Sequence, residues 1–350
     1  MIALLQNMDP PTGERVQDRQ ITTDVPTLNE SPTVNPIRQL PDKIGPYEIQ
    51  NILGEGGMGC VYLGLQRWPV ERQVAIKLIR SSLVSPKLSQ RFLAERRAMA
   101  RLSHPHVAQI LEANQTDDGF PYFVMEYIPG TPLTRYCDQR RLSLEGRLDL
   151  VASVCHGVDH AHRRGIIHRD LKPTNILVME RAGRPIPKII DFGIAKAFDK
   201  PLTDSTQLTG ELMLGTPAYM SPEAFRSYSD DEPDWRTDIY ALGVILYELV
   251  SGRRPFDLKG DLLQLLWKVT RQDPPPPSQR WMEESPFKRS EIAHNRGTKA
   301  DDLHHRLVND LDRIVVKAIA REREDRYESA AELAMDIDRY LRQIRSRRAT

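Results

Sequence analysis

The chain lacks a hydrophobic run long enough to cross a membrane. Its longest apolar stretch, IYALGVILYELV at 239–250, holds about a dozen residues, whereas a transmembrane helix needs about 20. The N-terminal MIALLQNMDPP has a short apolar run, but no basic residues precede it and it is too short for a secretion signal with a cleavage site. The sequence therefore predicts a protein without a membrane span, located in the cytoplasm.

Cysteine is scarce, and neither sign of charge dominates. The three cysteines, Cys60, Cys137 and Cys155, are odd in number and form no C-x-x-C pair. This argues against a disulfide framework and a cysteine zinc site, and it fits a reducing compartment. Lysine and arginine number 49 against 48 aspartates and glutamates. The near-zero net charge of +1 gives no reason to expect nucleic acid or an anionic lipid surface as a partner.

Residues 1–45 are polar, interrupted by proline and without apolar periodicity. Such a segment cannot bury enough surface to offset the entropy lost on ordering, so we predict a disordered N-terminal tail. The stretch 273–310 begins with DPPPP and is polar, and helical patterns resume after it. We interpret it as an insertion-like surface excursion within a domain. Residues 344–350 are predicted to form a basic C-terminal tail.

Between these segments lies one predicted domain, residues 46–343. Its first part contains runs of β-branched and aromatic residues, which predict strands at 47–53, 60–66, 73–79, 107–113 and 122–128. An apolar stripe at helical spacing predicts a helix at 87–102. Its second part predicts helices at 143–165, 237–252, 310–320 and 329–344. Strands followed by helices indicate an α+β architecture with two lobes, an N-lobe at 46–128 and a C-lobe at 129–343.

The glycines of LGEGGMGCVYLG (53–64) form the pattern G-x-G-x-x-G at Gly54, Gly56 and Gly59. A dinucleotide-binding fold would need a helix to follow, but CVYLGLQ favours a strand. A Walker loop would need Gly-Lys-Ser/Thr, which is absent. The remaining interpretation is a β-hairpin whose glycines allow backbone N–H groups to approach phosphate. Lys77 in VAIK (74–77) could reach such phosphates if a carboxylate, Glu95, holds it; from these residues alone, a surface lysine is equally consistent.

Two further stretches resemble a known family closely. IIHRDLKPTNILV (166–178) and KIIDFGIAK (188–196) contain His-Arg-Asp-Leu-Lys-Pro-x-Asn and Asp-Phe-Gly, the catalytic loop and magnesium motif of protein kinases. GTPAYMSPE (215–223) resembles the family's P+1 loop, with Ser221 where alanine is usual. The resemblance runs from Tyr47 to Leu341, and it is to the bacterial (Hanks-type, eukaryotic-like) serine/threonine protein kinases. It implies the two-lobed kinase fold, with a β-rich N-lobe and a mainly helical C-lobe.

The resemblance implies roles for individual residues. The catalytic group would be Asp170, Lys172, Asn175 and Thr216, and the Mg²⁺ ligands (or Mn²⁺ ligands) would be Asn175 and Asp191. Met125 would be the gatekeeper, Glu126 and Ile128 would present backbone groups to adenine, Val61 and Ala75 would cover it, and Leu177 would lie beneath. The ATP-binding residues implied are Leu53, Gly54, Glu55, Gly56, Gly57, Met58, Gly59, Val61, Ala75, Lys77, Glu95, Met125, Glu126, Ile128 and Leu177.

Substrate class and regulation follow from the same resemblance. DLKPTN and Thr216 are typical of the serine/threonine branch, so the expected partners are proteins with serine or threonine hydroxyls. Arg169 precedes the catalytic aspartate, as in kinases activated by a phosphorylated loop. Candidate phosphosites, in a trans-autophosphorylating dimer, are Thr203, Ser205, Thr206 and Thr209. Asp238 is expected to brace the catalytic loop, and Glu223 to pair with Arg326.

Other interpretations stay open at this point. The chain could be a pseudokinase that acts as a nucleotide-binding scaffold, although Lys77, Asp170, Asn175 and Asp191 are all present. A kinase-fold enzyme for small molecules is a weaker alternative, since GTPAYMSPE is retained. The spacing of His156 and His160, with His162 beyond, invites a zinc site, but packing or surface histidines are favoured. Cys60 is read as a packing residue, with an oxidant-sensitive thiol as the sharper hypothesis.

Overall fold

The computed structural model describes residues 40–56, 59–79, 102–192, 217–226, 234–256 and 262–349. These belong to a unit that extends from Leu40 to the C-terminus, separate from Met1–Gln39. Several predictions concern residues outside the described ranges. They are the tail up to residue 39, the helix predicted at 87–102 with Glu95, the loop residues Gly57 and Met58, the four candidate phosphosites, and Thr216.

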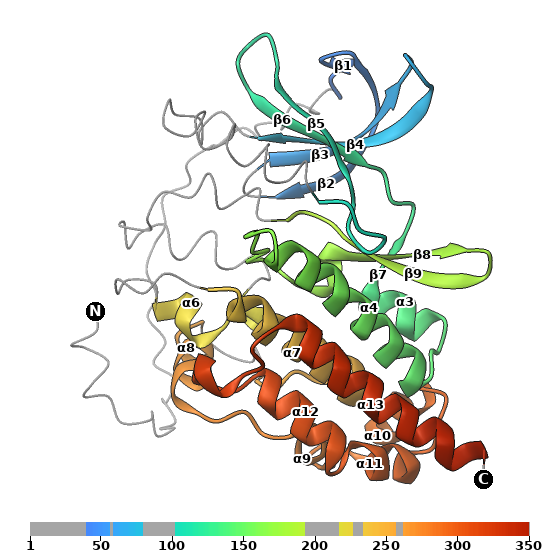
Figure 1. Cartoon of the computed structure of the whole chain (residues 1–350), viewed down its shortest axis with the longest axis vertical. Coiled ribbons are helices and arrows are strands. Elements are labelled where there is room, and N and C mark those ends of the chain that lie inside the picture. Colours follow the sequence, from blue (N-terminus) through green and yellow to red (C-terminus); the bar gives the residue numbers. More distant parts are fainter. Residues whose placement is uncertain are drawn as a thin grey trace, which may run out of the picture. The chain divides into compact units, whose positions relative to one another are not determined.

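An antiparallel sheet forms the N-lobe, at the upper end of Figure 1. Its strand order is β1-β2-β3-β4-β6-β5. The strands are β1 (Lys43–Ile44), β2 (Tyr47–Gly56), β3 (Gly59–Gln66), β4 (Arg72–Ile79), β5 (Ile110–Gln115) and β6 (Pro121–Glu126). β2 and β3 pair with Gly56 opposite Gly59, so the predicted glycine hairpin is confirmed.

The register of this sheet separates two apolar faces. Residues directly opposite each other on neighbouring strands point to the same face. Val61 lies opposite Lys77, and Ala75 lies opposite Met125, so these four side chains share one face. The alternate residues, such as Ile76 and its partner Val124, pack on the other face with a separate cluster. The strand pairing alone therefore places Lys77 beside the residues predicted to cover adenine.

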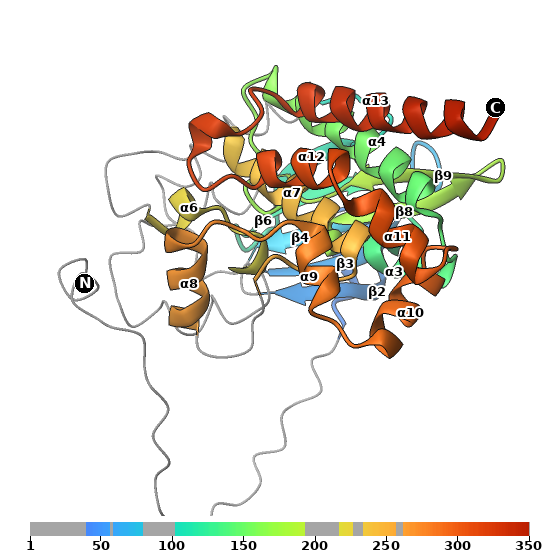
Figure 2. The ribbon, with the colours of Figure 1, turned by 90° about the horizontal axis from the view of Figure 1, so that it is seen from below.

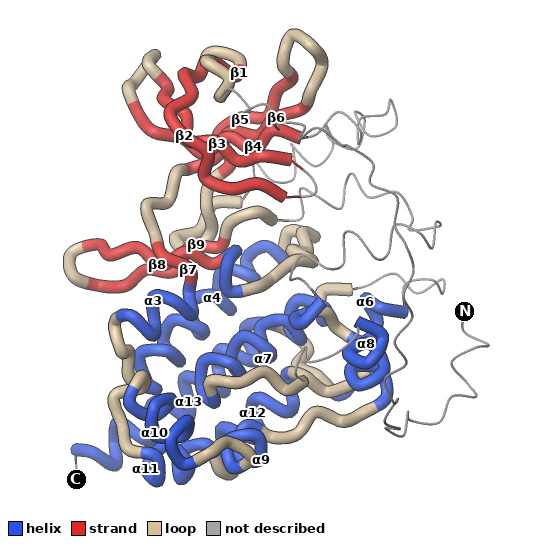
Figure 3. Tube along the Cα trace, turned by 180° about the vertical axis from the view of Figure 1, so that it is seen from behind, coloured by secondary structure: helices blue, strands red, loops and turns tan. Residues whose placement is uncertain are grey.

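The C-lobe consists of helices and a small second sheet, as Figure 3 shows by colour. That sheet is β7 (Thr131–Pro132), β8 (Ile176–Arg181) and β9 (Arg184–Ile189). The helices are α3 (Leu133–Gln139), α4 (Leu144–His162), α6 (Pro222–Arg226), α7 (Arg236–Ser251), α8 (Leu262–Arg271), α9 (Pro277–Met282), α10 (Pro286–His294), α11 (Ala300–Leu307), α12 (Asp310–Ala318) and α13 (Ala330–Ala349), with 3₁₀ turns η2 (Pro173–Asn175), η3 (Pro217–Tyr219) and η4 (Arg323–Asp325).

Helix α7 is the centre of the C-lobe core. It contacts α4, α9 and α12, and its residues from Thr237 to Tyr247 are all buried. A helix that is apolar on every side belongs in a protein core or a membrane, and the surrounding helices in Figure 2 show that α7 belongs to the core. α13 runs along α4 in Figures 1 and 2. Of the helices in the described ranges, none has both the length and the apolar character of a membrane span.

Both predicted ends of the domain need correction. The folded domain includes residues before 46, because β1 pairs with β2 and Ile44 packs in one buried cluster with Tyr47. At the other end, α13 continues to Ala349 through the predicted basic tail. Ile344 packs against the core there, and Arg345 pairs with Asp149 of α4. These contacts are tertiary, so local composition does not reveal them.

The stretch 273–310 folds into α9, α10 and α11. Met282 and Phe287 are exposed, in keeping with a surface location. Trp281, Leu303 and Leu307, however, are fully buried in the C-lobe core. This segment, predicted as an insertion, is therefore anchored to the lobe by apolar residues of its own.

Histidines gather where the loop that follows residue 101 crosses α4. The ring of His104 lies 5.4 Å from that of His106 and 5.0 Å from that of His160, measured between centroids. Gly157 of α4 allows this approach, because a Cβ there would lie 2.9 Å from Ile189 and 3.2 Å from the His106 carbonyl. Burial, and then the neighbouring histidines, lowers the pKa of His104 to about 4. Burial also lowers the pKa of His106 and of His160.

We predict that His104→Asn makes the protein less sensitive to acid. The folded-state pKa of His104, about 4, lies below the value of about 6.5 in an unfolded chain. The unfolded state therefore takes up a proton first, and stability is lost as pH falls from about 6.5 towards 4. Asparagine keeps an acceptor for the N–H of His106, which donates to His104 Nδ1. Calorimetric Tm values at pH 7.5, 6.5 and 5.5 should fall less in the variant than in the wild type. The exposed His294 supplies a control, since the Tm of His294→Asn should fall with pH as that of the wild type does. If the Tm of His104→Asn fell with pH as steeply as that of the wild type, the prediction would be wrong.

Candidate active site

The two lobes meet at an ion pair between Lys77 and Asp191. Nζ of Lys77, on β4, lies 3.1 Å from Oδ1 of Asp191, which follows β9. Lys77 is 9% exposed. A largely buried lysine needs a charged partner, so its placement here is specific and a surface lysine is excluded. Its predicted partner Glu95 lies outside the described residues.

Asp170 lies at the centre of the predicted catalytic loop. Its Oδ2 accepts a hydrogen bond from Nζ of Lys172 at 2.8 Å. Nδ2 of Asn175 donates to the backbone oxygen of Asp170 at 2.8 Å and to Oδ2 at 3.1 Å. The other carboxylate oxygen, Oδ1, is buried and has no hydrogen-bond partner within the described part of the chain. Buried acceptors are nearly always paired, and exceptions often mark a functional atom.

The backbone of this loop is held from α7 by Asp238, as predicted. The carboxylate accepts hydrogen bonds from the backbone N–H groups of His168, at 2.7 Å, and Arg169, at 2.8 Å. Nε2 of His162 also lies 2.8 Å from Oδ2. Burial alone would raise the pKa of Asp238, but the bond and charge of His162 and the contacts with His168 hold it below the ordinary value. His162, which the sequence placed with packing or surface histidines, is thus part of the loop's support.

Two residues of the site have backbone conformations that non-glycine residues rarely adopt. Arg169 has φ of 64° and Asp191 has φ of 60°. Such residues persist only where the surroundings hold them. The imidazole of His168 supplies one restraint, since its Nε2 lies 2.9 Å from the carbonyl oxygen of Ile190. Its ring also packs 4.8 Å from that of Phe192. These two contacts of His168 therefore hold the predicted catalytic loop against the segment that contains Asp191.

The residues predicted to hold adenine come from both lobes. Val61, Ala75 and Met125 lie in one apolar cluster on the sheet face that carries Lys77. Ile128, just after β6, is buried, and Leu177 is half-buried on β8. The Glu126 side chain pairs with Nζ of Lys188 on β9 at 2.9 Å, which ties the connection between the lobes to the C-lobe. The predicted adenine residues thus come from the N-lobe sheet, from the segment just after β6, and from β8.

The glycine hairpin presents exposed backbone. Leu53, Gly54, Glu55 and Gly56 are exposed along β2, and the thiol of Cys60 lies 3.4 Å from the Gly54 carbonyl. Gly59 requires glycine for a steric reason, because a Cβ there would lie 2.0 Å from the Leu78 carbonyl oxygen.

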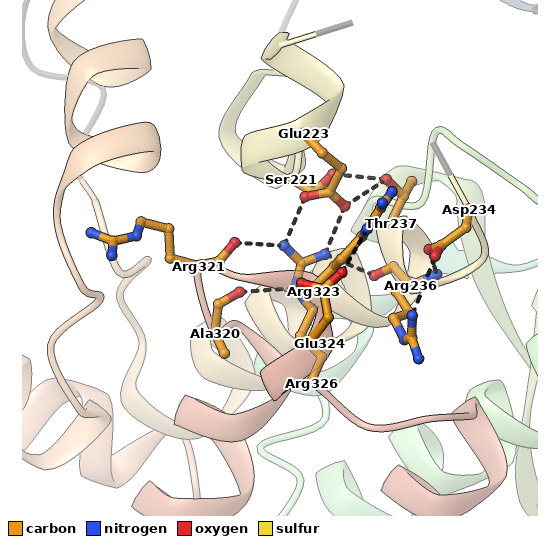
Figure 4. Close-up of polar contacts among 10 residues, drawn as sticks. All are labelled: Ser221, Glu223, Asp234, Arg236, Thr237, Ala320, Arg321, Arg323, Glu324 and Arg326. Atoms are coloured by element: carbon orange, nitrogen blue, oxygen red, sulfur yellow. Dashed lines mark hydrogen bonds and ion pairs between the residues drawn. The ribbon is translucent and has the colours of Figure 1, made fainter. Parts of the chain in front are cut away.

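A polar network fixes the segment 217–226, which begins within the GTPAYMSPE stretch. Arg326 donates 2.7 Å hydrogen bonds to both oxygens of Glu223, as predicted and as Figure 4 shows. Ser221, the departure from the usual alanine, lies 2.8 Å from the hydroxyl of Thr237, which in turn donates to Glu223. Tyr219 donates a 2.6 Å hydrogen bond to Glu248 of α7. No sequence pattern pointed to these last contacts.

Comparison with known proteins agrees with this geometry. The family description "Protein kinase domain" matches residues 47–333. The chain belongs to the protein kinase family. Within that family it is similar to the serine/threonine-protein kinase Pkn1 of Myxococcus xanthus, with 35% identity over 83% of this chain and 37% of that protein. It is 34% identical to PknB of Mycobacterium leprae, over 84% of this chain and 42% of that protein. The predicted resemblance to bacterial serine/threonine kinases is confirmed.

A solved kinase-family structure has the same fold. The PknI kinase domain of Mycobacterium tuberculosis superposes with a TM-score of 0.59 at 25% identity, covering 85% of this chain and 96% of that one. The predicted two-lobed α+β fold is therefore confirmed. The chain spans only about two fifths of the length of the curated kinases that it matches.

Proposed function

We propose that this protein transfers the γ-phosphate of ATP to serine and threonine hydroxyls of proteins. The observation that carries the proposal is the environment of Asp170. Its Oδ2 is engaged by Lys172 and Asn175, while Oδ1 is buried without a partner among the described residues. An acceptor oriented in this way is suited to receive the hydrogen bond, and then the proton, of a substrate hydroxyl.

The roles of the surrounding residues follow from the demands of the reaction. Phosphoryl transfer passes through a loose transition state, so the protein mainly positions groups and neutralises charge. Lys77, with Glu95 as its proposed partner, would bind the α- and β-phosphates, and Lys172 would face the γ-phosphate. The hydroxyl oxygen forms a bond to phosphorus as the bond to the β–γ bridging oxygen breaks, which releases ADP. Thr216, outside the described residues, is proposed to orient Asp170 and Lys172.

The donor set fits a hard divalent cation. Asp191 offers a carboxylate, and Asn175 uses its Nδ2 on Asp170, which leaves its amide oxygen as the metal-binding atom. Mg²⁺ prefers such oxygen ligands, one or two carboxylates complemented by substrate phosphates. We propose Mg²⁺, with Mn²⁺ as a substitute. The bound ion would neutralise charge on the phosphates.

Regulation and location are extensions of the proposal. Phosphorylation of Thr203, Ser205, Thr206 or Thr209, in trans between two copies, would pair with Arg169. Thr206 and Thr209 are favoured. A cytoplasmic location is supported by Cys137 and Cys155, which are buried thiols outside any disulfide.

The test is transfer of labelled γ-phosphate from Mg-ATP to the protein itself and to myelin basic protein. We expect label on both, abolished by EDTA, with acid hydrolysis giving phosphoserine and phosphothreonine. Mass spectrometry should place phosphate between residues 200 and 216. Nucleotide binding without any transfer would overturn the proposal and favour a pseudokinase scaffold, and phosphotyrosine alone would overturn the substrate class.

A further inference from the structure

Arg296, in the turn after α10, is a buried cation whose hydrogen-bond partners among the described residues are all backbone carbonyls. It is 3% exposed. Nε donates to the carbonyls of Leu249, at 2.9 Å, and Val250, at 2.8 Å. Nη2 donates to Glu248 at 3.1 Å, and Nη1 to Ile292 at 3.0 Å. Burial lowers the pKa of Arg296 to about 9, so the side chain is still charged at neutral pH.

Three of these carbonyls belong to the last turn of α7. The final carbonyls of a helix have no partner within the helix and carry the negative end of its dipole. Arg296 supplies both hydrogen-bond donors and a positive charge to these carbonyls, of which that of Glu248 also accepts a hydrogen bond from the backbone N–H of Gly252. Gly252 ends the helix with φ of 75°, and a Cβ there would lie 2.8 Å from Ile292 of α10. The inserted segment therefore caps α7 by charge and by close packing.

The capped turn also carries the residue that holds the P+1 loop. Glu248 accepts the 2.6 Å hydrogen bond from Tyr219 through its side chain and the hydrogen bond from Arg296 through its carbonyl. Tyr219 ends η3, within the GTPAYMSPE stretch that resembles the substrate-binding platform. Burial, followed by the charge and hydrogen bond of Glu248, raises the pKa of Tyr219, so it remains a donor.

We propose that Arg296 is a positioning residue for protein-substrate binding, acting through Glu248 and Tyr219. The inserted segment, residues 273–310, thereby stabilises the position of the P+1 loop through the C-terminal turn of α7. This rests on the proposed kinase activity and assigns part of its substrate binding to a segment outside the ATP site.

Arg147 provides a matched control. It is also buried, at 1% exposure, and its Nη2 donates to the carbonyl of Asn295, the residue next to Arg296, at 2.7 Å. Its other hydrogen bonds go to Cys137, Asp138 and Leu142 around the α3–α4 connection. Arg147 therefore secures the same turn without reaching α7.

The experiment measures KM for myelin basic protein and for ATP in the full chain with Arg296→Met, Arg296→Lys and Arg147→Met. We expect Arg296→Met to raise KM for the protein substrate about tenfold, which corresponds to about 1.4 kcal/mol, with KM for ATP within twofold. Arg296→Lys should recover part of the loss, since its ammonium can still donate to the carbonyls. Arg147→Met should lower Tm without changing KM for myelin basic protein.

A second variant keeps the test decisive if Arg296→Met does not fold. Tyr219→Phe removes the donor to Glu248 and should raise KM for myelin basic protein. In the double variant Tyr219→Phe/Arg296→Lys, the increase in KM should be smaller than the sum of the two single effects, because both residues act through Glu248. Additive effects, or equal KM increases in Arg147→Met and the Arg296 variants, would overturn the inference. A wild-type protein that phosphorylates nothing would instead refute the kinase activity itself.

Discussion

Asp170→Asn is expected to lower the rate of phosphate transfer by about 10²- to 10⁴-fold, the range typical of a lost general base. Asparagine has nearly the same size, so the loop geometry should persist, but an amide cannot take the proton of the attacking hydroxyl. Oδ1 of Asp170 is the atom proposed to accept the proton, since Lys172 and Asn175 bind Oδ2. Initial rates at saturating Mg-ATP, for the protein itself and for myelin basic protein, measure the effect.

The matched control is Asp117→Asn in the exposed turn between β5 and β6. It makes the same chemical change away from the site and should leave the rate unaltered. Nucleotide affinity and Tm of Asp170→Asn should stay close to wild type, which separates lost catalysis from lost folding. A rate within threefold of wild type would remove Asp170 from the role of base.

Arg326→Met is expected to destabilise the C-lobe by about 3–5 kcal/mol. The Arg326 side chain is fully buried, donates to both oxygens of Glu223 and to the carbonyls of Ala320, Arg236 and Arg321, and lies 5.0 Å above the Tyr240 ring. Its removal takes away the guanidinium that donates to both oxygens of Glu223, whose side chain is only 15% exposed. A Tm decrease of about 5–15 °C, measured by calorimetry, is the expected readout.

Two comparisons test the cause of this loss. Arg345→Ala removes one member of an exposed pair, with side chains 55% and 49% exposed, and should cost less than about 1 kcal/mol. The double variant Glu223→Gln/Arg326→Met removes both charges, so it should be less destabilised than the sum of the single changes. Strict additivity of the two changes would show that the pair is not the source of the stability.

Short-range patterns allowed much of the fold and site to be predicted. The predicted N-lobe strands have bounds within about three residues of β2 to β6. The helices predicted at 143–165, 237–252 and 310–320 match α4, α7 and α12 equally well, whereas the helix predicted at 329–344 ends five residues before α13 does. Periodicity is a local property, so it is readable without the fold. The ends at β1 and α13 were misjudged because their order depends on Ile44 and Arg345 contacting distant elements.

Partnerships at long range were predictable only where the family resemblance supplied them. Asp238 and the Glu223–Arg326 pair were expected on that basis, and the structure has both. His162, Glu248 and Arg296 carried no such signal. A histidine in an H-x-H pattern or an arginine in a polar insertion has many ordinary explanations, and nothing in the neighbouring residues selects among them.

From the sequence we could read the residues that the proposed chemistry uses. Lys77, Asp170, Asn175 and Asp191 stand in short motifs, because groups that act on one phosphate must project from a few tight turns, and this keeps their spacing readable along the chain. The tertiary structure alone decided what supports those groups. The cap of Arg296 on α7, 48 residues away from Glu248, and the 103-residue span from Glu223 to Arg326 arise when apolar helices pack and buried charges must find partners, which depends on the whole fold.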